Sequence, residues 1–132
     1  MEMQMKGFHG QPVDGSADLI LEAKPTTLIR SCNLKRTRTF EPQETCEATW
    51  YEHTPEGVAE ASATAYFFAK RLYDVLGIPV AVINVSWGGT PIEGWMNPEL
   101  LKSEFADEIN LSNLVNKEWP KKGAHQVPGV LY

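Results

Sequence analysis

The chain has 132 residues and a formal net charge of -5, from 12 basic and 17 acidic side chains. This length suits one domain, and 42% hydrophobic with 22% charged residues is typical of an ordinary globular protein rather than a disordered one. The mild acidity argues against a nucleic-acid-binding protein, which would carry a basic face. No apolar run reaches the ~20 residues of a membrane span, and the first residues lack the charged-then-apolar layout of a signal peptide.

The N-terminal part of the chain predicts loops, one short helix and two strands. The stretch through Pro25 is rich in Gly, Pro and Asp, and only residues 17–23 suit a helix. Residues 26–33 and 47–52 are rich in β-branched, aromatic and apolar side chains, which favour strands. Between them lies a basic cluster, which predicts a solvated strand edge or loop, with an anionic-ligand patch as the alternative. Its members are Lys35, Arg36 and Arg38.

The two cysteines, Cys32 and Cys46, leave two states open: one disulfide, or two buried thiols. The sequence contains no Cys-x-x-Cys pair and no His/Cys cluster. We therefore expect no structural zinc site.

One long helix and a buried strand come next. Thr54 and Pro55 suit the N-cap and first position of a helix of about twenty residues, and Gly77 suits its left-handed C-terminal cap. Apolar side chains recur along it at three- and four-residue steps: Val58, Ala61, Ala65, Phe68, Ala69, Leu72 and Leu76. The apolar run 79–85 then predicts a strand buried on both faces, so that 47–52, the helix and 79–85 form a βαβ unit of a parallel sheet.

A glycine pair, Gly88 and Gly89, follows this strand almost directly, where α/β sheets place their ligands. Two interpretations of the pair stay open. One is a tight turn that needs a positive φ, and the other is a pair of main-chain N–H donors for the charge that develops on an ester carbonyl. Trp87 and Trp95 flank the turn and could line a sugar site, although core packing is the default for a tryptophan. Residues 91–95 suit a short helix, residues 98–118 suit one or two more, and the tail from Pro120 to Tyr132 is loop-like.

Residues 84–88 (NVSWG) come close to the Gly-x-Ser-x-Gly nucleophile elbow, with Asn84 in place of the first glycine. That departure favours Ser86 as a small residue that closes the strand over Ser86 as a nucleophile. A catalytic triad would also need a histidine and an acid. The histidines of the chain are His9, His53 and His125, and none of them has a recognisable sequence setting.

Three segments strongly resemble sialate O-acetylesterases: residues 1–7 (MEMQMKG), 65–72 (AYFFAKRL) and 83–96 (INVSWGGTPIEGWM). These enzymes belong to the SGNH-type hydrolases, which also include related acetylxylan esterases. The resemblance implies a three-layer α/β/α sandwich of flavodoxin-like character with a parallel sheet. It also implies that a serine hydrolyses acetyl esters on sugars, without a metal or other cofactor.

The resemblance also assigns roles to residues. The nucleophile of the family lies in Gly-Gln-Ser-Asn directly before Met-Glu-Met, and here Met-Glu-Met begins at Met1. The Asp-x-x-His pair of the family has no counterpart in this sequence. We therefore expect residues 1–132 to form a single partial domain of an esterase that is inactive alone. Gly88 and Gly89 would be its oxyanion donors, Trp87 and Trp95 would contact the sugar, and Ser86 would not be the nucleophile.

The expected partner is an acetylated sugar, either sialic acid or a related glycan. We expect neither a nucleic acid nor a membrane as a partner. The parent protein is expected to be secreted or periplasmic, and the isolated fragment is expected to self-associate, because its sheet would lack neighbours. Two alternatives stay open. One is an α/β-hydrolase esterase that uses Ser86 with His125 or His53, and the other is a non-catalytic glycan-binding module that uses Trp87 and Trp95.

Overall fold

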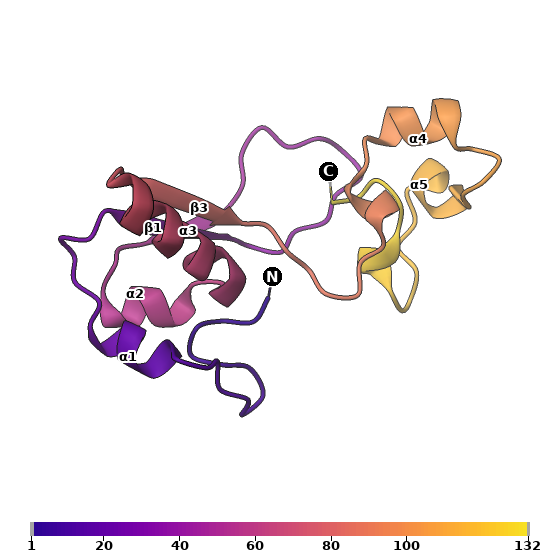
Figure 1. Cartoon of the computed structure of the whole chain (residues 1–132). Coiled ribbons are helices and arrows are strands. Elements are labelled where there is room, and N and C mark those ends of the chain that lie inside the picture. Colours follow the sequence, from indigo (N-terminus) through magenta and orange to yellow (C-terminus); the bar gives the residue numbers. More distant parts are fainter. Residues whose placement is uncertain (1, 132) are drawn as a thin grey trace. The chain divides into compact units, whose positions relative to one another are not determined.

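The computed structural model describes residues 2–131 and divides into two compact units (Figure 1). Unit 1 comprises Met1–Lys35 and Cys46–Ser86, and unit 2 comprises Arg36–Thr45 and Trp87–Tyr132. Two residues named in the sequence predictions, Met1 and Tyr132, lie outside the described residues. That residues 1–132 form a single partial domain of a larger protein stays a prediction.

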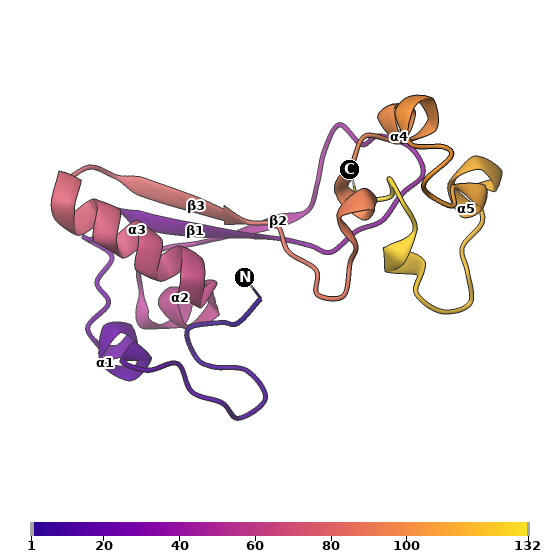
Figure 2. The same cartoon turned by 45° about the vertical axis from the view of Figure 1, so that its right-hand side comes forward.

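Unit 1 contains a sheet of three strands: β1 (Ile29–Leu34), β2 (Ala48–Tyr51) and β3 (Val80–Asn84), in the order β2-β1-β3. Strand β1 pairs antiparallel with β2 and parallel with β3 (Figure 2). The expected α/β class and the parallel pairing are therefore confirmed. The expected βαβ unit is wrong in one respect, because the parallel partner of β3 is β1. Strand β2 turns back on β1, and the helices that follow bring the chain to the other side of β1.

The long helix expected after Thr54 is two helices, α2 (Pro55–Glu60) and α3 (Ala63–Leu76). Ala61 between them is extended, with φ −65° and ψ 147°. The N-terminal segment occupies the break: the Met5 N–H donates to the Ala61 carbonyl over 2.9 Å, and the Ala63 N–H donates to the Met3 carbonyl over 2.8 Å. The break therefore depends on a segment distant in sequence, which local helix propensity does not report.

The signals at the helix ends are confirmed. The Thr54 side chain accepts a hydrogen bond from the Gly57 N–H over 3.1 Å, and Pro55 is the first residue of α2. Gly77 ends α3 with a left-handed φ of 64°. The short helix expected within residues 17–23 is α1 (Ser16–Leu21).

Unit 1 buries a small apolar core between its helices and the N-terminal segment: Met5, Ala23, Val58, Ala61, Ala63 and Tyr66. Part of the predicted helical stripe lies outside this core, because Phe68 is 62% and Leu76 55% exposed. Strand β3 is not buried on both faces as expected, since Ile83 is 58% exposed. In the described part of the chain β3 is an edge strand, and α1, α2 and α3 all lie on one side of the sheet (Figures 1 and 2).

Unit 2 contains short helices around a second core. These are the 3-10 helix η1 (Ile92–Trp95), α4 (Pro98–Glu104), α5 (Ser112–Asn116) and the 3-10 helix η2 (Ala124–Gln126). The buried residues of the core are Leu101, Leu111, Leu114, Val127 and Val130. The Leu131 N–H donates to the Gly94 carbonyl over 2.8 Å, so the C-terminal tail is fastened to η1. The helices expected within residues 91–95 and 98–118 are confirmed.

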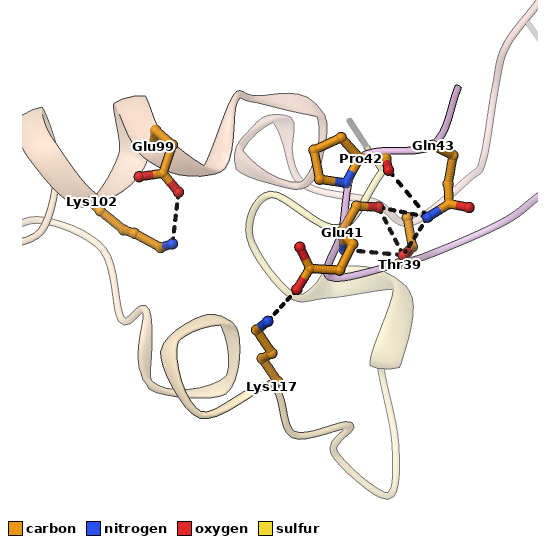
Figure 3. Close-up of polar contacts among 7 residues, drawn as sticks. All are labelled: Thr39, Glu41, Pro42, Gln43, Glu99, Lys102 and Lys117. Carbon is orange, nitrogen blue, oxygen red and sulfur yellow. Dashed lines mark hydrogen bonds and ion pairs between the residues drawn. The ribbon is translucent and has the colours of Figure 1, made fainter. Parts of the chain in front are cut away.

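The segment Arg36–Thr45 also belongs to unit 2. The Thr39 N–H donates to the Val130 carbonyl over 2.9 Å, and the Phe40 ring lies 4.0 Å from that of Trp119. Figure 3 shows the Thr39 hydroxyl hydrogen-bonded to the main chain of Glu41, whose carboxylate pairs with Lys117. These contacts make the segment part of the unit rather than a free loop.

Lys35 and Arg38 of the basic cluster make contacts within their own units. The Lys35 ammonium lies 2.8 Å from the Glu47 carboxylate in unit 1. In unit 2, the Arg38 guanidinium lies 5.2 Å from the centre of a Trp119 ring, a cation–π arrangement. These contacts fit the expected strand edge and loop.

Candidate functional site

The glycine pair forms an exposed turn in unit 2, between Trp87 and Thr90. Gly89 has a φ of 76°, a conformation that side chains other than glycine rarely adopt. The tight-turn interpretation is therefore confirmed for Gly89. The second interpretation, in which main-chain N–H groups of Gly88 and Gly89 bind an oxyanion, stays a prediction.

Three side-chain hydrogen bonds hold the turn. The Thr90 hydroxyl donates to the Trp87 carbonyl over 2.6 Å, and the Trp95 indole N–H donates to the Thr90 hydroxyl over 2.9 Å. On the other side, the Gln126 amide donates to the Gly89 carbonyl over 3.1 Å. The exposed turn is thus hydrogen-bonded on both sides.

The sequence pattern did not predict a role for Thr90 or Gln126. The signal for Thr90 was present, because a threonine three residues after Trp87 can bond back to its carbonyl in a local turn. Gln126 had no such signal, since only the packing of the C-terminal tail brings η2 to the turn.

His125 lies beside the turn and stacks on Trp87. The two ring centres are 5.5 Å apart and the rings are nearly parallel, at 10°. A Cβ built on Gly89 would lie 3.7 Å from the Nε2 atom of His125. Trp87, Trp95 and His125 are each half-buried, so unit 2 brings both predicted tryptophans and one predicted histidine to the turn.

Ser86 and His53 belong to unit 1. The Ser86 hydroxyl donates to the Asn84 side-chain carbonyl over 3.0 Å. His53 is buried, with its Nε2 atom 3.0 Å from the Tyr66 hydroxyl and its Nδ1 atom 3.2 Å from the main-chain nitrogen of Lys24. Burial lowers the pKa of His53. Both of its ring nitrogens are thus engaged in holding α3 and the segment after α1, which is a structural role rather than that of a base for Ser86.

No family model matches the chain. Over 59 residues the chain is 39% identical to the sialate O-acetylesterase of Homo sapiens, and over 42 residues it is 45% identical to that of Rattus norvegicus. The resemblance to sialate O-acetylesterases is confirmed. The human match covers 41% of this chain and 11% of the relative, and the rat match covers 32% and 8%. The chain therefore spans about a tenth of the length of the sialate O-acetylesterases that it matches.

The fold is similar to that of another acetylesterase. The chain matches a crystal structure of a carbohydrate acetylesterase from Xanthomonas citri with a TM-score of 0.69 and 25% sequence identity. This match covers 90% of the chain and 23% of the solved protein. The α/β fold expected from the sialate O-acetylesterase resemblance is thereby confirmed.

Both cysteines are free, with Cys32 buried and Cys46 exposed, so neither of the two expected states is present. Burial raises the pKa of the Cys32 thiol. Within residues 2–131, no three His, Cys, Asp or Glu side chains are grouped so that they could hold a metal ion. None of the helices in this described range is both long and apolar enough to cross a membrane.

Proposed function

We propose that this chain is part of a carbohydrate O-acetylesterase that removes acetyl groups from sialic acid or a related glycan. In this proposal the turn at Gly88 and Gly89 supplies main-chain N–H donors to the reaction. The observation that carries the proposal is an exposed but hydrogen-bonded glycine turn in a chain that is similar to acetylesterases.

The chemistry explains why a glycine turn would be used. When a nucleophile attacks the acetyl carbonyl carbon, the electron pair of the C=O bond moves onto its oxygen. N–H groups already aimed at that oxygen stabilise the charge without reorganising. Glycines allow the main chain to come close to the reacting carbonyl, because no Cβ intervenes. The nucleophile itself is assigned by the resemblance to a Gly-Gln-Ser-Asn motif, which this sequence does not contain.

Trp87 and Trp95 are the proposed sugar contacts. The Trp87 ring is backed by His125 on one side, so its other side could receive the apolar face of a sugar ring. The indole N–H of Trp95 is used by Thr90, so Trp95 would offer the sugar only its ring.

An acetylated glycan substrate also bears on location. If the substrate is displayed outside the cytoplasm, the enzyme must reach it there, and we propose that the parent protein is secreted or periplasmic. Fractionation of the source cells tests this, since recovery of the protein in the cytoplasmic fraction alone would contradict it.

Release of acetate by the native protein carrying this sequence tests the function. We expect acetate from O-acetylated sialic acid or acetylated xylose oligomers, and loss of that activity after reaction with a serine-directed fluorophosphonate. Absence of acetate release from both sugars would contradict the proposal. Glycan binding without ester hydrolysis would instead support a non-catalytic module.

A further inference from the structure

A chain of side-chain hydrogen bonds crosses the carboxyl ends of two parallel strands in unit 1. Asn33 and Asn84 are register partners on β1 and β3. The Ser86 hydroxyl donates to the Asn84 Oδ1 atom over 3.0 Å, and the Asn84 Nδ2 atom donates to the Asn33 Oδ1 atom over 3.4 Å. Ser86 is thus tied to both strands, and only Trp87 separates it from Gly88 in sequence.

The chain of hydrogen bonds continues to the N-terminal segment through Glu60, the last residue of α2. The Asn33 Nδ2 atom donates to the Glu60 main-chain carbonyl over 3.1 Å. The Glu60 carboxylate accepts a hydrogen bond from the Gln4 side chain over 2.8 Å and pairs with the Lys6 ammonium. The break after Glu60 is also where Met3 and Met5 bond to the main chain.

These hydrogen bonds run in one direction. Each asparagine accepts from the residue before it through Oδ1 and donates to the next through Nδ2. A side-chain amide can do both at once, whereas an apolar side chain can do neither and a carboxylate cannot donate. Asn33, Asn84 and Ser86 are all half-buried, which strengthens such bonds and makes an unpaired group costly.

We propose that Asn84 is a positioning residue for ester hydrolysis, holding Ser86 and thereby the start of the glycine turn in place. The inference rests on the proposed function, since it concerns turnover at that turn. It also gives a reason for the asparagine at the position where the nucleophile elbow has glycine: the side chain that fills this site links two strand ends. A displacement of about 1 Å in a catalytic group can lower the rate about 10²-fold.

The test compares Asn84→Ala with Val82→Ala in the native protein. Val82 lies on the same strand, two residues away, so both side chains lie on the same face, and Val82 is also half-buried. We expect Asn84→Ala to lower kcat for acetate release about 5- to 10-fold with KM within about twofold, and Ser86→Ala to have an effect of the same size because it breaks the same hydrogen bond. Val82→Ala should lower the unfolding temperature, because it removes part of a half-buried apolar side chain. Its kcat should stay within about twofold of wild type, because the hydrogen bonds that link Ser86, Asn84, Asn33 and Glu60 remain intact.

A double-mutant cycle separates positioning from general loss of stability. Asn33→Ala breaks the same chain of hydrogen bonds at its next member. The Asn33→Ala/Asn84→Ala double variant should therefore turn over no more slowly than Asn84→Ala alone. Should Asn84→Ala fail to fold, Asn33→Ala and Ser86→Ala must each lower kcat by more than Val82→Ala does.

The outcomes are distinct. An active wild-type protein whose kcat is unchanged by Asn84→Ala overturns the positioning role and leaves the proposed function standing. Fully additive losses in the double variant also overturn it. A wild-type protein that releases no acetate overturns the proposed function, and the positioning role with it.

Discussion

Single residues set the geometry of the glycine turn from both sides. Gly89 adopts a left-handed conformation, and Thr90 and Gln126 hold the main-chain carbonyls around it. On the preceding side, the Ser86 hydroxyl is committed to Asn84. The turn therefore depends on the glycine conformation and on side-chain hydrogen bonds, and the Trp87–His125 stack lies beside it.

Ser86→Ala separates a positioning serine from a nucleophile. We expect turnover in the native protein to stay within about tenfold of wild type, a loss of no more than ~1.4 kcal/mol in transition-state stabilisation. The variant removes the hydrogen bond from Ser86 to Asn84 and no reacting group. A fall of about 10⁴-fold or more, measured as kcat for acetate release, would show that Ser86 is the nucleophile.

His53 makes stability depend on pH. Its pKa is lowered from the ordinary 6.5, chiefly by burial and further by the nearby charges of Lys70 and Arg30. As the pH falls below about 6.5, the unfolded chain takes up a proton that folded His53 resists, so this contribution to stability is present above pH 6.5 and lost below it. Urea denaturation from pH 8 to pH 5 should show a smaller loss of unfolding free energy for His53→Gln than for wild type.

The matched control is His9→Gln, because His9 is exposed on a loop. This variant removes a histidine and leaves the hydrogen bonds of His53 in place. Equal pH dependence for wild type and His53→Gln would contradict the role assigned to buried His53.

At the scale of elements, features set by neighbouring residues were predicted correctly, and features set by long-range contacts were not. The start of α2 and the end of α3 were predictable, because Thr54, Pro55 and Gly77 act on their own immediate neighbours. The break at Ala61 was not, since its carbonyl is satisfied by Met5 at the other end of unit 1. The parallel partner of β3 was mispredicted for the same reason: strand pairing is decided by the whole sheet.

The site shows the same division. The position of the glycine turn after β3, with Trp87 and Trp95 beside it, was predicted correctly from the sequence. The positions of His125 and Gln126 beside the turn could not be predicted, because both residues lie in a tail without a periodic pattern. The exposure of Ile83 was also unpredictable, since an apolar run does not say which neighbours will cover it.

The N-cap of α2 allows a direct stability test. Thr54→Ala removes the acceptor for the Gly57 N–H and should lower the free energy of unfolding by about 1 kcal/mol. Thr64→Ala in α3 is the control, because Thr64 is exposed and alanine favours the helix. Chemical denaturation measures both, and equal stability of Thr54→Ala and wild type would show that the cap contributes nothing.

At the scale of the whole molecule, the described residues of unit 1 leave one side of its sheet without a helical layer (Figures 1 and 2). Trp50 and Ile83 flank Cys32 as register partners on that side, and they are 56% and 58% exposed. Phe68, Val75 and Leu76 of α3 are also more than half exposed. An α/β/α sandwich would cover such surfaces, and apolar patches that stay open favour association.

We therefore expect the isolated chain to form oligomers on size-exclusion chromatography and to hydrolyse p-nitrophenyl acetate no faster than a denatured control. Ile83→Lys should reduce the oligomers, because it places a charge on the open face of the sheet. Leu21→Lys is the control, since Leu21 is 77% exposed on α1. A monomeric wild-type chain would contradict the self-association, and hydrolysis blocked by a serine-reactive inhibitor would place the nucleophile within this chain.

The oxyanion role of the glycine turn is tested most directly by the kcat for acetate release in three valine variants of the native protein. Gly10 has the same φ as Gly89, 76°, and an added Cβ meets nothing within 4 Å, so Gly10→Val controls for backbone strain alone. The account predicts that Gly88→Val or Gly89→Val lowers kcat about 10²- to 10³-fold, the usual loss for one oxyanion donor. Gly10→Val should stay within about threefold of wild type. Unchanged kcat in both Gly88→Val and Gly89→Val would reduce the turn to a structural one.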